Sequence, residues 1–316
     1  MTTLAISKKA GFSARYKIVR NSVKRDAWIY LLCVPFVAYY IIFHYMPMYG
    51  AIIAFKDYDI NLGIMASPWV GLKHFQNFIH DYYFVRVLKN TLLISLYDLI
   101  FGFPAPIIFA FLLNEISNKL FKKTIQTITY LPHFISLVVI CGMLTDFLSK
   151  DGLITGILEN FGMEPTYYLS YPQYFRTIFI ASGVWQSVGW GSIIYLAALS
   201  GIDPQLYEAA TIDGASKLKQ VFHVTLPGIA PTIVTLLILQ MGRVMSVGYE
   251  KIILLYNSNT YETADVISSY VYRLGLGGGM RYSYTTAIGL FSSLINLILL
   301  TLTNKVSKMV SENSLW

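Results

Sequence analysis

The chain has 316 residues, of which 55% are hydrophobic and only 13% are charged, and its mean hydropathy is +0.54. This composition is typical of membrane proteins and argues against an ordinary soluble domain. The formal charge of +7 comes from basic residues spread over several segments, so it indicates membrane topology and weighs against a nucleic-acid partner.

Six segments are long and apolar enough to cross a hydrocarbon core of about 30 Å, which takes about 20 helical residues. An outer-membrane barrel would instead show short segments of alternating hydrophobicity. The sequence therefore predicts an all-α, polytopic membrane helix bundle with six transmembrane helices: Ala27–Tyr49, Thr91–Leu113, Thr124–Leu148, Tyr174–Leu199, Pro227–Val247 and Tyr282–Thr303.

Basic residues precede the first span, and they also occur after the second, fourth and sixth spans. Placing all of them in the cytosol satisfies the positive-inside rule and predicts cytosolic N and C termini. The expected organisation is a basic cytosolic segment 1–26, a transmembrane domain 27–304 and a cytosolic tail 305–316. The first apolar stretch is too long for a cleaved signal. Cys33 and Cys141 lie inside spans and imply no disulfide framework and no metal site.

The segments predicted to face outward carry no nucleotide motif. The first, residues 50–90, has aromatic residues at the spacing of a short amphipathic helix, which fits either an interfacial helix or a cap on the bundle. The glycine run Gly275–Gly279 lacks the following Lys-Ser or Lys-Thr of a phosphate-binding loop, and no such motif occurs elsewhere in the chain. If ATP powers this protein, another chain binds it.

The loop between the fourth and fifth spans predicts a short helix. Asp203 and Pro204 supply an N-cap and a first-turn proline. Gln205–Ile212 then form about two turns, and Gly214 offers the flexible residue with which a helix ends.

A second short helix is predicted to follow in the same loop. Ser216 is its candidate cap, the stretch SKLKQVFHV has apolar residues on one face, and Leu226-Pro227 is expected to end it. The loop 203–227 is thus predicted to be a helix–turn–helix elbow. Its small alanines let another protein approach the backbone, and its two carboxylates can meet basic groups.

The order of residues in this elbow resembles a known motif. The string E-A-A-x-x-D-G-A followed ten residues later by Leu-Pro is similar to the EAA motif of binding-protein-dependent ABC importer permeases. NTLLISL, FGFPAPIIFAFLLNE and YETADVISSYVYRLGL resemble the carbohydrate-uptake branch, in particular an LplB-like group that includes a permease of an alginate importer. The positions that match the motif are Glu208, Ala209, Ala210, Asp213, Gly214, Ala215, Leu226 and Pro227.

This resemblance implies a type I importer permease domain over 27–304, in a bacterial inner (cytoplasmic) membrane, that transports oligosaccharides. The elbow would be the ATPase-coupling loop. The implied partners are a second homologous permease subunit, an ATPase subunit dimer, an extracytoplasmic solute-binding protein and membrane lipid. The chain would have no catalytic residues, metal site or cofactor of its own, because ATP and Mg would be used by the partner ATPase.

A substrate-binding layer is predicted in the spans that flank the elbow. Measured from the elbow, Gln186 lies about 25 Å up one helix, and Gln240 and Arg243 lie about 20 Å and 24 Å up the next. Aromatic faces, amides and guanidinium groups suit sugars, although such residues also pack between helices or anchor at the membrane interface. The candidate substrate-binding residues are Trp185, Gln186, Trp190, Gln240, Arg243 and Ser246.

Asp98 is predicted to lie at a depth comparable with that of Arg243. A charged side chain inside a span normally faces the interior or a partner. Two interpretations stay open: an Asp98–Arg243 ion pair, or recognition of an acidic sugar by Arg243.

Two other functions compete with an ATP-driven importer. An ion-gradient-driven secondary transporter commonly shows internal repeats and coupling carboxylates near the midplane, whereas this chain shows no clear repeat and only the isolated Asp98. A membrane enzyme needs converging acid–base or metal groups, and the five histidines are scattered over different segments.

Overall fold

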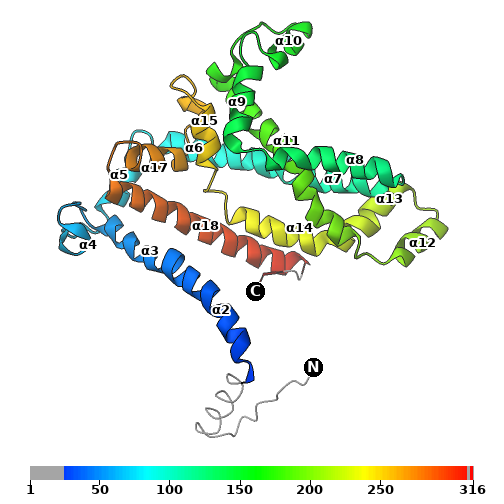
Figure 1. Ribbon diagram of the computed structural model, residues 1–316, viewed down its shortest axis with the longest axis horizontal. Helices are drawn as coiled ribbons and strands as arrows, with labels where there is room; N and C mark the ends of the chain where they lie inside the picture. Colours follow the sequence, from blue (N-terminus) through cyan, green and yellow to red (C-terminus); the bar gives the residue numbers. More distant parts are fainter. Residues whose placement is uncertain (1–24, 312–313, 316) are drawn as a thin grey trace.

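The computed structural model describes residues 25–311, 314 and 315. These residues form helices joined by turns and loops, without any β-sheet, and an isolated antiparallel bridge joins Lys56 and Trp69. The predicted all-α fold is therefore confirmed (Figure 1). Most of the predicted basic segment 1–26 lies outside the described residues, and the cytosolic placement of the termini stays a prediction.

Long helices make up most of the molecule. The helices of the described range that are long and apolar enough to cross a membrane are Ala27–Phe55, Phe84–Glu115, Lys217–Met241 and Tyr282–Met309, and a bent pair over 119–147 would add a fifth span. The predicted fourth span corresponds to α11 (Pro172–Leu199), a continuous helix of 28 residues that is about 42 Å long. The polar residues of α11 reduce its hydropathy, so the full count of six spans stays a prediction.

These spans are assembled from shorter helical pieces. The first joins α2 (Ala27–Tyr40), α3 (Met46–Met48) and the 3-10 helix Tyr49–Phe55; the second joins α6 (Phe84–Tyr97) and α7 (Pro104–Glu115); the next joins α13 (Lys217–Gln220) and α14 (Leu226–Met241); and the last is α18 (Tyr282–Ser311). The bent pair comprises α8 (Lys119–Tyr130) and α9 (Leu137–Phe147). The connecting helices are α4 (Gly63–Ala66), α5 (Lys73–Ile79), α10 (Leu153–Asn160), α12 (Pro204–Ile212), α15 (Tyr249–Leu255), α16 (Tyr261–Ala264) and α17 (Ile267–Gly275).

Three spans pass a proline without ending. A π-helical turn precedes each of these prolines by two residues, at Ile41–Tyr45 before Pro47, at Asp98–Gly102 before Pro104 and at Val221–Thr225 before Pro227. Proline has no amide hydrogen, and its ring clashes with the carbonyl four residues earlier. The wider π turn shifts the hydrogen bonds by one residue just before the proline, so the helix continues.

The predicted third span, Thr124–Leu148, is not one helix, and that prediction was wrong. α8 and the following turn Leu131–Phe134 meet α9 at an angle of 99°. The break begins at the Leu131-Pro132 pair and is completed at Ser136, whose hydroxyl caps α9 by accepting a hydrogen bond from the Val139 amide at 3.4 Å. A proline followed by a good N-cap residue starts a new helix in a new direction.

The first span diverges from the rest of the bundle (Figure 1). None of its most apolar window is buried, and Trp28 and Phe36 are 78% and 70% exposed. A continuous apolar surface of this length is unstable in water. It therefore requires cover from lipid or from another subunit.

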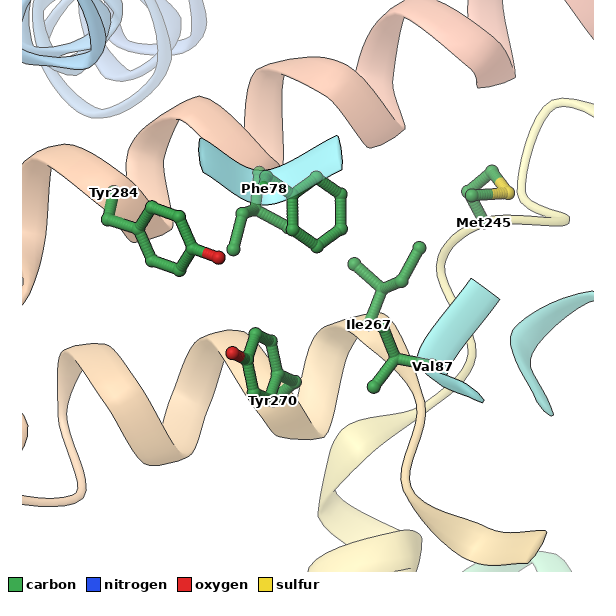
Figure 2. Packing of buried hydrophobic residues seen from close by; sticks show 7 residues of the cluster. Phe78, Val87, Met245, Ile267, Tyr270 and Tyr284 are labelled. Atoms are coloured by element: carbon green, nitrogen blue, oxygen red, sulfur yellow. The ribbon is translucent and has the colours of Figure 1, made fainter. Parts of the chain in front are cut away.

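The segment between the first two spans packs against α17 and the beginning of α18. Phe78 of α5 lies in a buried cluster with Ile267 and Tyr270 of α17 and Tyr284 of α18, and Met245 closes the cluster from the segment after α14 (Figure 2). All five side chains are at most 4% exposed. Residues 50–83 thus form a cap that holds α17 and α18 in place.

The carboxylate of Asp81 links the cap to α17 and α18 through hydrogen bonds. Asp81 accepts hydrogen bonds from the hydroxyls of Tyr284 at 2.6 Å and Tyr270 at 3.0 Å, and from the amide of Tyr83 at 2.8 Å. Burial raises the pKa of Asp81, but these hydrogen bonds and nearby Arg281 outweigh it, so its pKa lies below the usual value.

We expect acid to loosen this contact. A depressed carboxyl pKa contributes stability that is present above the unfolded pKa, near 4, and is lost as the pH falls through the folded value. Tyr284→Phe removes a hydrogen bond to a charged group, so the apparent melting temperature in detergent should fall at pH 7 and the difference from wild type should shrink towards pH 3. Tyr82→Phe, at an exposed neighbour, is the control. A deficit that is the same at every pH would contradict the role given to the Asp81 charge.

Candidate functional site: an elbow and a charged cavity

The first half of the predicted elbow is confirmed. α12 begins at Pro204 as predicted, because the Asp203 carboxylate accepts a hydrogen bond from the Gln205 amide at 2.9 Å. It ends at Ile212, and Gly214 two residues later has a φ of +74°, in the left-handed region that favours glycine. The Ala215 amide then donates to the Ala210 carbonyl at 2.9 Å, which closes the turn with the bond typical of a glycine C-cap.

The second half differs from its prediction. Leu226-Pro227 does not end a helix, because α13 runs through the π turn into α14 as one span. The Leu226 amide donates to the Val221 carbonyl five residues earlier, which makes room for the ring of Pro227. The elbow is therefore continuous with the span that follows it, and a displacement of the elbow moves α14 directly.

Internal hydrogen bonds brace the elbow. The amide of Gln220, which is 6% exposed, donates to the Thr211 hydroxyl at 3.0 Å and to the Ala215 carbonyl at 3.3 Å. The hydroxyls of Tyr207 and Thr225 are hydrogen-bonded at 3.0 Å. Sequence reasoning missed Gln220 and Tyr207. Their only sequence signal is a polar side chain on the inner side of a short amphipathic helix.

The outside of the elbow carries apolar side chains that nothing in the described chain covers. Ile212, Leu218 and Phe222 are 86%, 72% and 63% exposed. The carboxylates of Glu208 and Asp213 are exposed beside them. An apolar patch with flanking charges is typical of a protein-docking surface.

A cavity of about 330 Å³ lies further from the elbow, between α6, α11 and the segment that follows α14. We call it the distal compartment. Its polar lining consists of Ser95, Asp98, Gln186, Gln240, Arg243, Ser246 and Lys251. Four of the six predicted substrate residues therefore line one cavity, although contact with a substrate stays a prediction.

A second cavity, the proximal compartment, lies nearer the elbow. It has a volume of about 420 Å³, and its walls include Ser187 and Tyr195 of α11 and Leu236 of α14. The two compartments share Asp98, Gln240 and Arg243. These three side chains therefore lie at the junction between the two compartments, which together form a polar track along the bundle.

The two tryptophans predicted to bind substrate, Trp185 and Trp190, do not line the distal compartment. Trp185 lines a separate cavity of about 750 Å³ beside Tyr97 and Phe101. Trp190 stacks on His133 with ring centroids 4.6 Å apart. They do not line the distal compartment with the other four residues, and a role of any of the six in substrate binding stays a prediction.

Asp98 is paired, but not with Arg243. The Gln240 amide donates to an Asp98 carboxylate oxygen at 2.7 Å, and no ion pair joins Asp98 to Arg243 in the part of the chain that the structure describes. Gly102 makes this geometry possible, because a Cβ there would overlap the Asp98 carboxylate. Of the two interpretations left open for Arg243, the structure does not show the ion pair with Asp98.

Arg243 and Ser246 were predicted on a helix, but α14 ends at Met241. The guanidinium is carried by a turn in which the Arg243 amide donates to the Gln240 carbonyl at 2.9 Å. Beyond it, Asn296 of α18 accepts a hydrogen bond from the Met245 amide at 2.9 Å. Irregular backbone at membrane depth is stable where neighbouring helices satisfy it and where it borders a cavity.

Sequence reasoning also missed Lys251 of α15, which is 8% exposed. Its ammonium donates to the Phe179 carbonyl at 2.9 Å and lies 4.7 Å from the centroid of the Phe179 ring. Gly183 leaves room for it, because a Cβ there would lie 3.4 Å from the Lys251 nitrogen. The available signal was a lysine inside the apolar run YEKIILL, since a buried lysine needs specific partners.

A membrane helix bundle with a braced elbow between two spans and a polar track above it defines the class of membrane transport permeases. The family model described as "Binding-protein-dependent transport system inner membrane component" matches residues 102–311. The chain belongs to this family and is an inner-membrane protein.

Relatives and solved structures agree with this membership. The chain is 41% identical over 296 residues to protein LplB of Bacillus subtilis, covering 93% of each chain. It is 43% identical over 293 residues to the polygalacturonan/rhamnogalacturonan transport system permease protein YteP of the same organism, covering 92% of this chain and 91% of the relative. It is also similar, with a TM-score of 0.85 and 42% identity over 93% of this chain and 99% of the other, to a chain of a bacterial ABC transporter that imports the acidic polysaccharide alginate. A second structure of that kind, in complex with an alginate pentasaccharide-bound periplasmic protein, gives a TM-score of 0.86 at the same identity and coverage.

Proposed function

We propose that this chain is the permease subunit of an ATP-driven, binding-protein-dependent oligosaccharide importer. The elbow is the observation that carries the proposal. Its α12 is capped at both ends, its second helix is continuous with α14, and internal hydrogen bonds hold its two halves together. A rigid body of this kind transmits displacement into the bundle, which is what coupling between two distant sites requires.

In this proposal the ATPase subunit dimer binds ATP and Mg and docks on the cytosolic elbow. Ile212, Leu218 and Phe222 enter its surface, while Glu208 and Asp213 meet its basic groups. Closure of the ATPases moves α14, and the junction between the two compartments alternates between access from outside and access from inside. A second permease subunit and lipid cover the first span, and a solute-binding protein delivers the oligosaccharide from outside.

Energy dependence tests this proposal against a secondary transporter. We expect the assembly purified with its partners, when reconstituted into liposomes, to accumulate oligosaccharide delivered by its binding protein only when ATP is present on the ATPase side. Collapse of ion gradients with ionophores should leave the initial rate within about twofold of the control. Uptake that continues without ATP and stops with ionophores would show that the proposal is wrong.

A further inference from the structure

A groove separate from the polar track lies along α11. It is the cavity of about 750 Å³ that contains Trp185, and we call it the lateral groove. Its α11 wall runs from Gln173 to Trp185, and the lining positions recur at the spacing of one helix face. Tyr97 and Phe101 form the opposite wall. The groove is thus an elongated channel between two helical segments.

The middle and the inner end of the lateral groove are apolar. Ile180 is buried there and packs with Tyr97 and Val184 in one hydrophobic cluster, which gives the groove a firm floor. Phe101 and Trp185 are 59% and 47% exposed, so the walls are open to the surroundings of the chain. At membrane depth, an opening of this kind suits an acyl chain.

The other end of the lateral groove is polar, because Arg176 lies there with Gln173 and Thr177. The partly buried guanidinium of Arg176 donates to the side-chain oxygen of Asn90 at 2.7 Å and to the carbonyl of Thr263 at 3.3 Å. Both acceptors are neutral, and no carboxylate pairs with Arg176 in the part of the chain that the structure describes. The two hydrogen bonds hold the cation at the groove and leave other N–H donors for a ligand.

The position of Arg176 along α11 matches the level of lipid headgroups. α11 is about 42 Å long, so it exceeds a hydrocarbon core of about 30 Å by about 6 Å at each end. Arg176 lies about 6 Å from the start of α11, and Trp185 lies about 14 Å further along. The lateral groove therefore extends from one membrane boundary almost to the midplane, which is the depth of one lipid leaflet.

We propose that the lateral groove binds an anionic phospholipid of the leaflet remote from the elbow. One acyl chain lies along Ile180, Val184 and Trp185, and the headgroup phosphate binds Arg176. A guanidinium matches two phosphate oxygens with parallel hydrogen bonds, and basic pockets between membrane helices bind anionic headgroups. Because Arg176 is also bonded to Asn90 of α6, the lipid stabilises the contact between α6 and α11. This inference goes beyond the proposed function and requires neither ATP nor cargo.

A lipid titration of the purified assembly in detergent tests the inference. We would follow the apparent melting temperature while adding dioleoylphosphatidylglycerol or dioleoylphosphatidylethanolamine, which carry identical acyl chains. Half of the maximal stabilisation should need a mole fraction of the anionic lipid at least about fivefold lower than that of the other lipid, and this preference should weaken with salt. Inorganic phosphate should give no shift, which distinguishes a lipid site from a site for free phosphate.

Three variants assign the preference to the lateral groove. Arg176→Gln keeps a hydrogen-bonding side chain near Asn90 but removes the charge, so the ratio of the two half-effect fractions should fall to about one. Ala181→Phe adds bulk to the groove wall without changing its charge and should abolish stabilisation by both lipids. Lys89→Met removes an exposed charge from α6 outside the groove and should keep the wild-type ratio. Melting temperature and recovery of each assembly without added lipid detect a folding defect separately.

Other outcomes overturn the inference. Equal half-effect fractions in the wild type, or a preference that Arg176→Gln leaves intact, would show that Arg176 does not bind the headgroup. Stabilisation that persists in Ala181→Phe would place the lipid elsewhere. Loss of the second permease subunit from the Ala181→Phe assembly would assign the groove to a contact between subunits, and a shift with inorganic phosphate alone would assign Arg176 to a free anion.

Discussion

Gly189→Ala is expected to destabilise the assembled bundle by about 2–3 kcal/mol, in the upper part of the range for overpacked cores. Gly189 is buried in α11, and a Cβ at this position would overlap the carbonyl of Thr129 in α8. The obstacle is backbone, so no side-chain rotation relieves it. The two helices must separate, which also disturbs the stacking of the adjacent Trp190 on His133.

The control is a glycine-to-alanine substitution at a position where the added Cβ meets no neighbouring atom. Gly289→Ala in α18 adds a methyl group with no atom within 4 Å, and alanine favours a helix over glycine by about 1 kcal/mol. Gly289→Ala should therefore match or exceed the wild-type melting temperature in detergent, while Gly189→Ala falls below it. Equal melting temperatures for both variants would contradict the tight contact between α11 and α8.

The sequence predicted the helix ends that are determined by residues close by in the chain. Asp203 caps α12 through the amide two residues later, and Gly214 ends it through a backbone conformation that other residues avoid, so neighbouring residues determine both ends. The same holds for apolar spans. Their existence depends on composition, which the sequence displays directly.

The sequence could not predict where helices tolerate a break. Leu226-Pro227 looks like a stop, but the preceding π turn carries the helix past the proline. The reverse happens at Pro132, where a suitable cap at Ser136 starts a new helix and the span bends. The outcome depends on whether the surrounding helices stabilise a wide turn or a sharp one, and that information is tertiary.

In the candidate site, too, features set by the local sequence were predicted, whereas features set by tertiary contacts were not. Distance along a helix placed Trp185 and Gln186 at one height, but successive residues point about 100° apart, and only Gln186 faces the distal compartment. Lys251 entered the site from a segment that looked like an external loop. The pairing of Asp98 with Gln240 depends on the absence of a side chain at Gly102, which no motif marks.

Gly214→Val is expected to leave the protein inserted and assembled but to reduce transport at least tenfold. Valine at a φ of +74° is a genuine outlier, with a cost of about 1–2 kcal/mol for the left-handed conformation. A Cβ there meets no atom within 4 Å, so the effect is on the backbone of the turn alone. The residue is exposed and belongs to none of the buried clusters, so the bundle itself should remain stable.

The altered turn would change the angle between α12 and α13, and the elbow would no longer transmit the displacement of the ATPases to α14. Abundance in the membrane and copurification with the ATPase should stay near wild type, while oligosaccharide uptake per ATP hydrolysed falls. Gly214→Asn is the matched control, because asparagine tolerates the left-handed region and should retain most of the uptake. Wild-type uptake by Gly214→Val at equal abundance would show that the geometry of this turn does not couple ATP hydrolysis to transport.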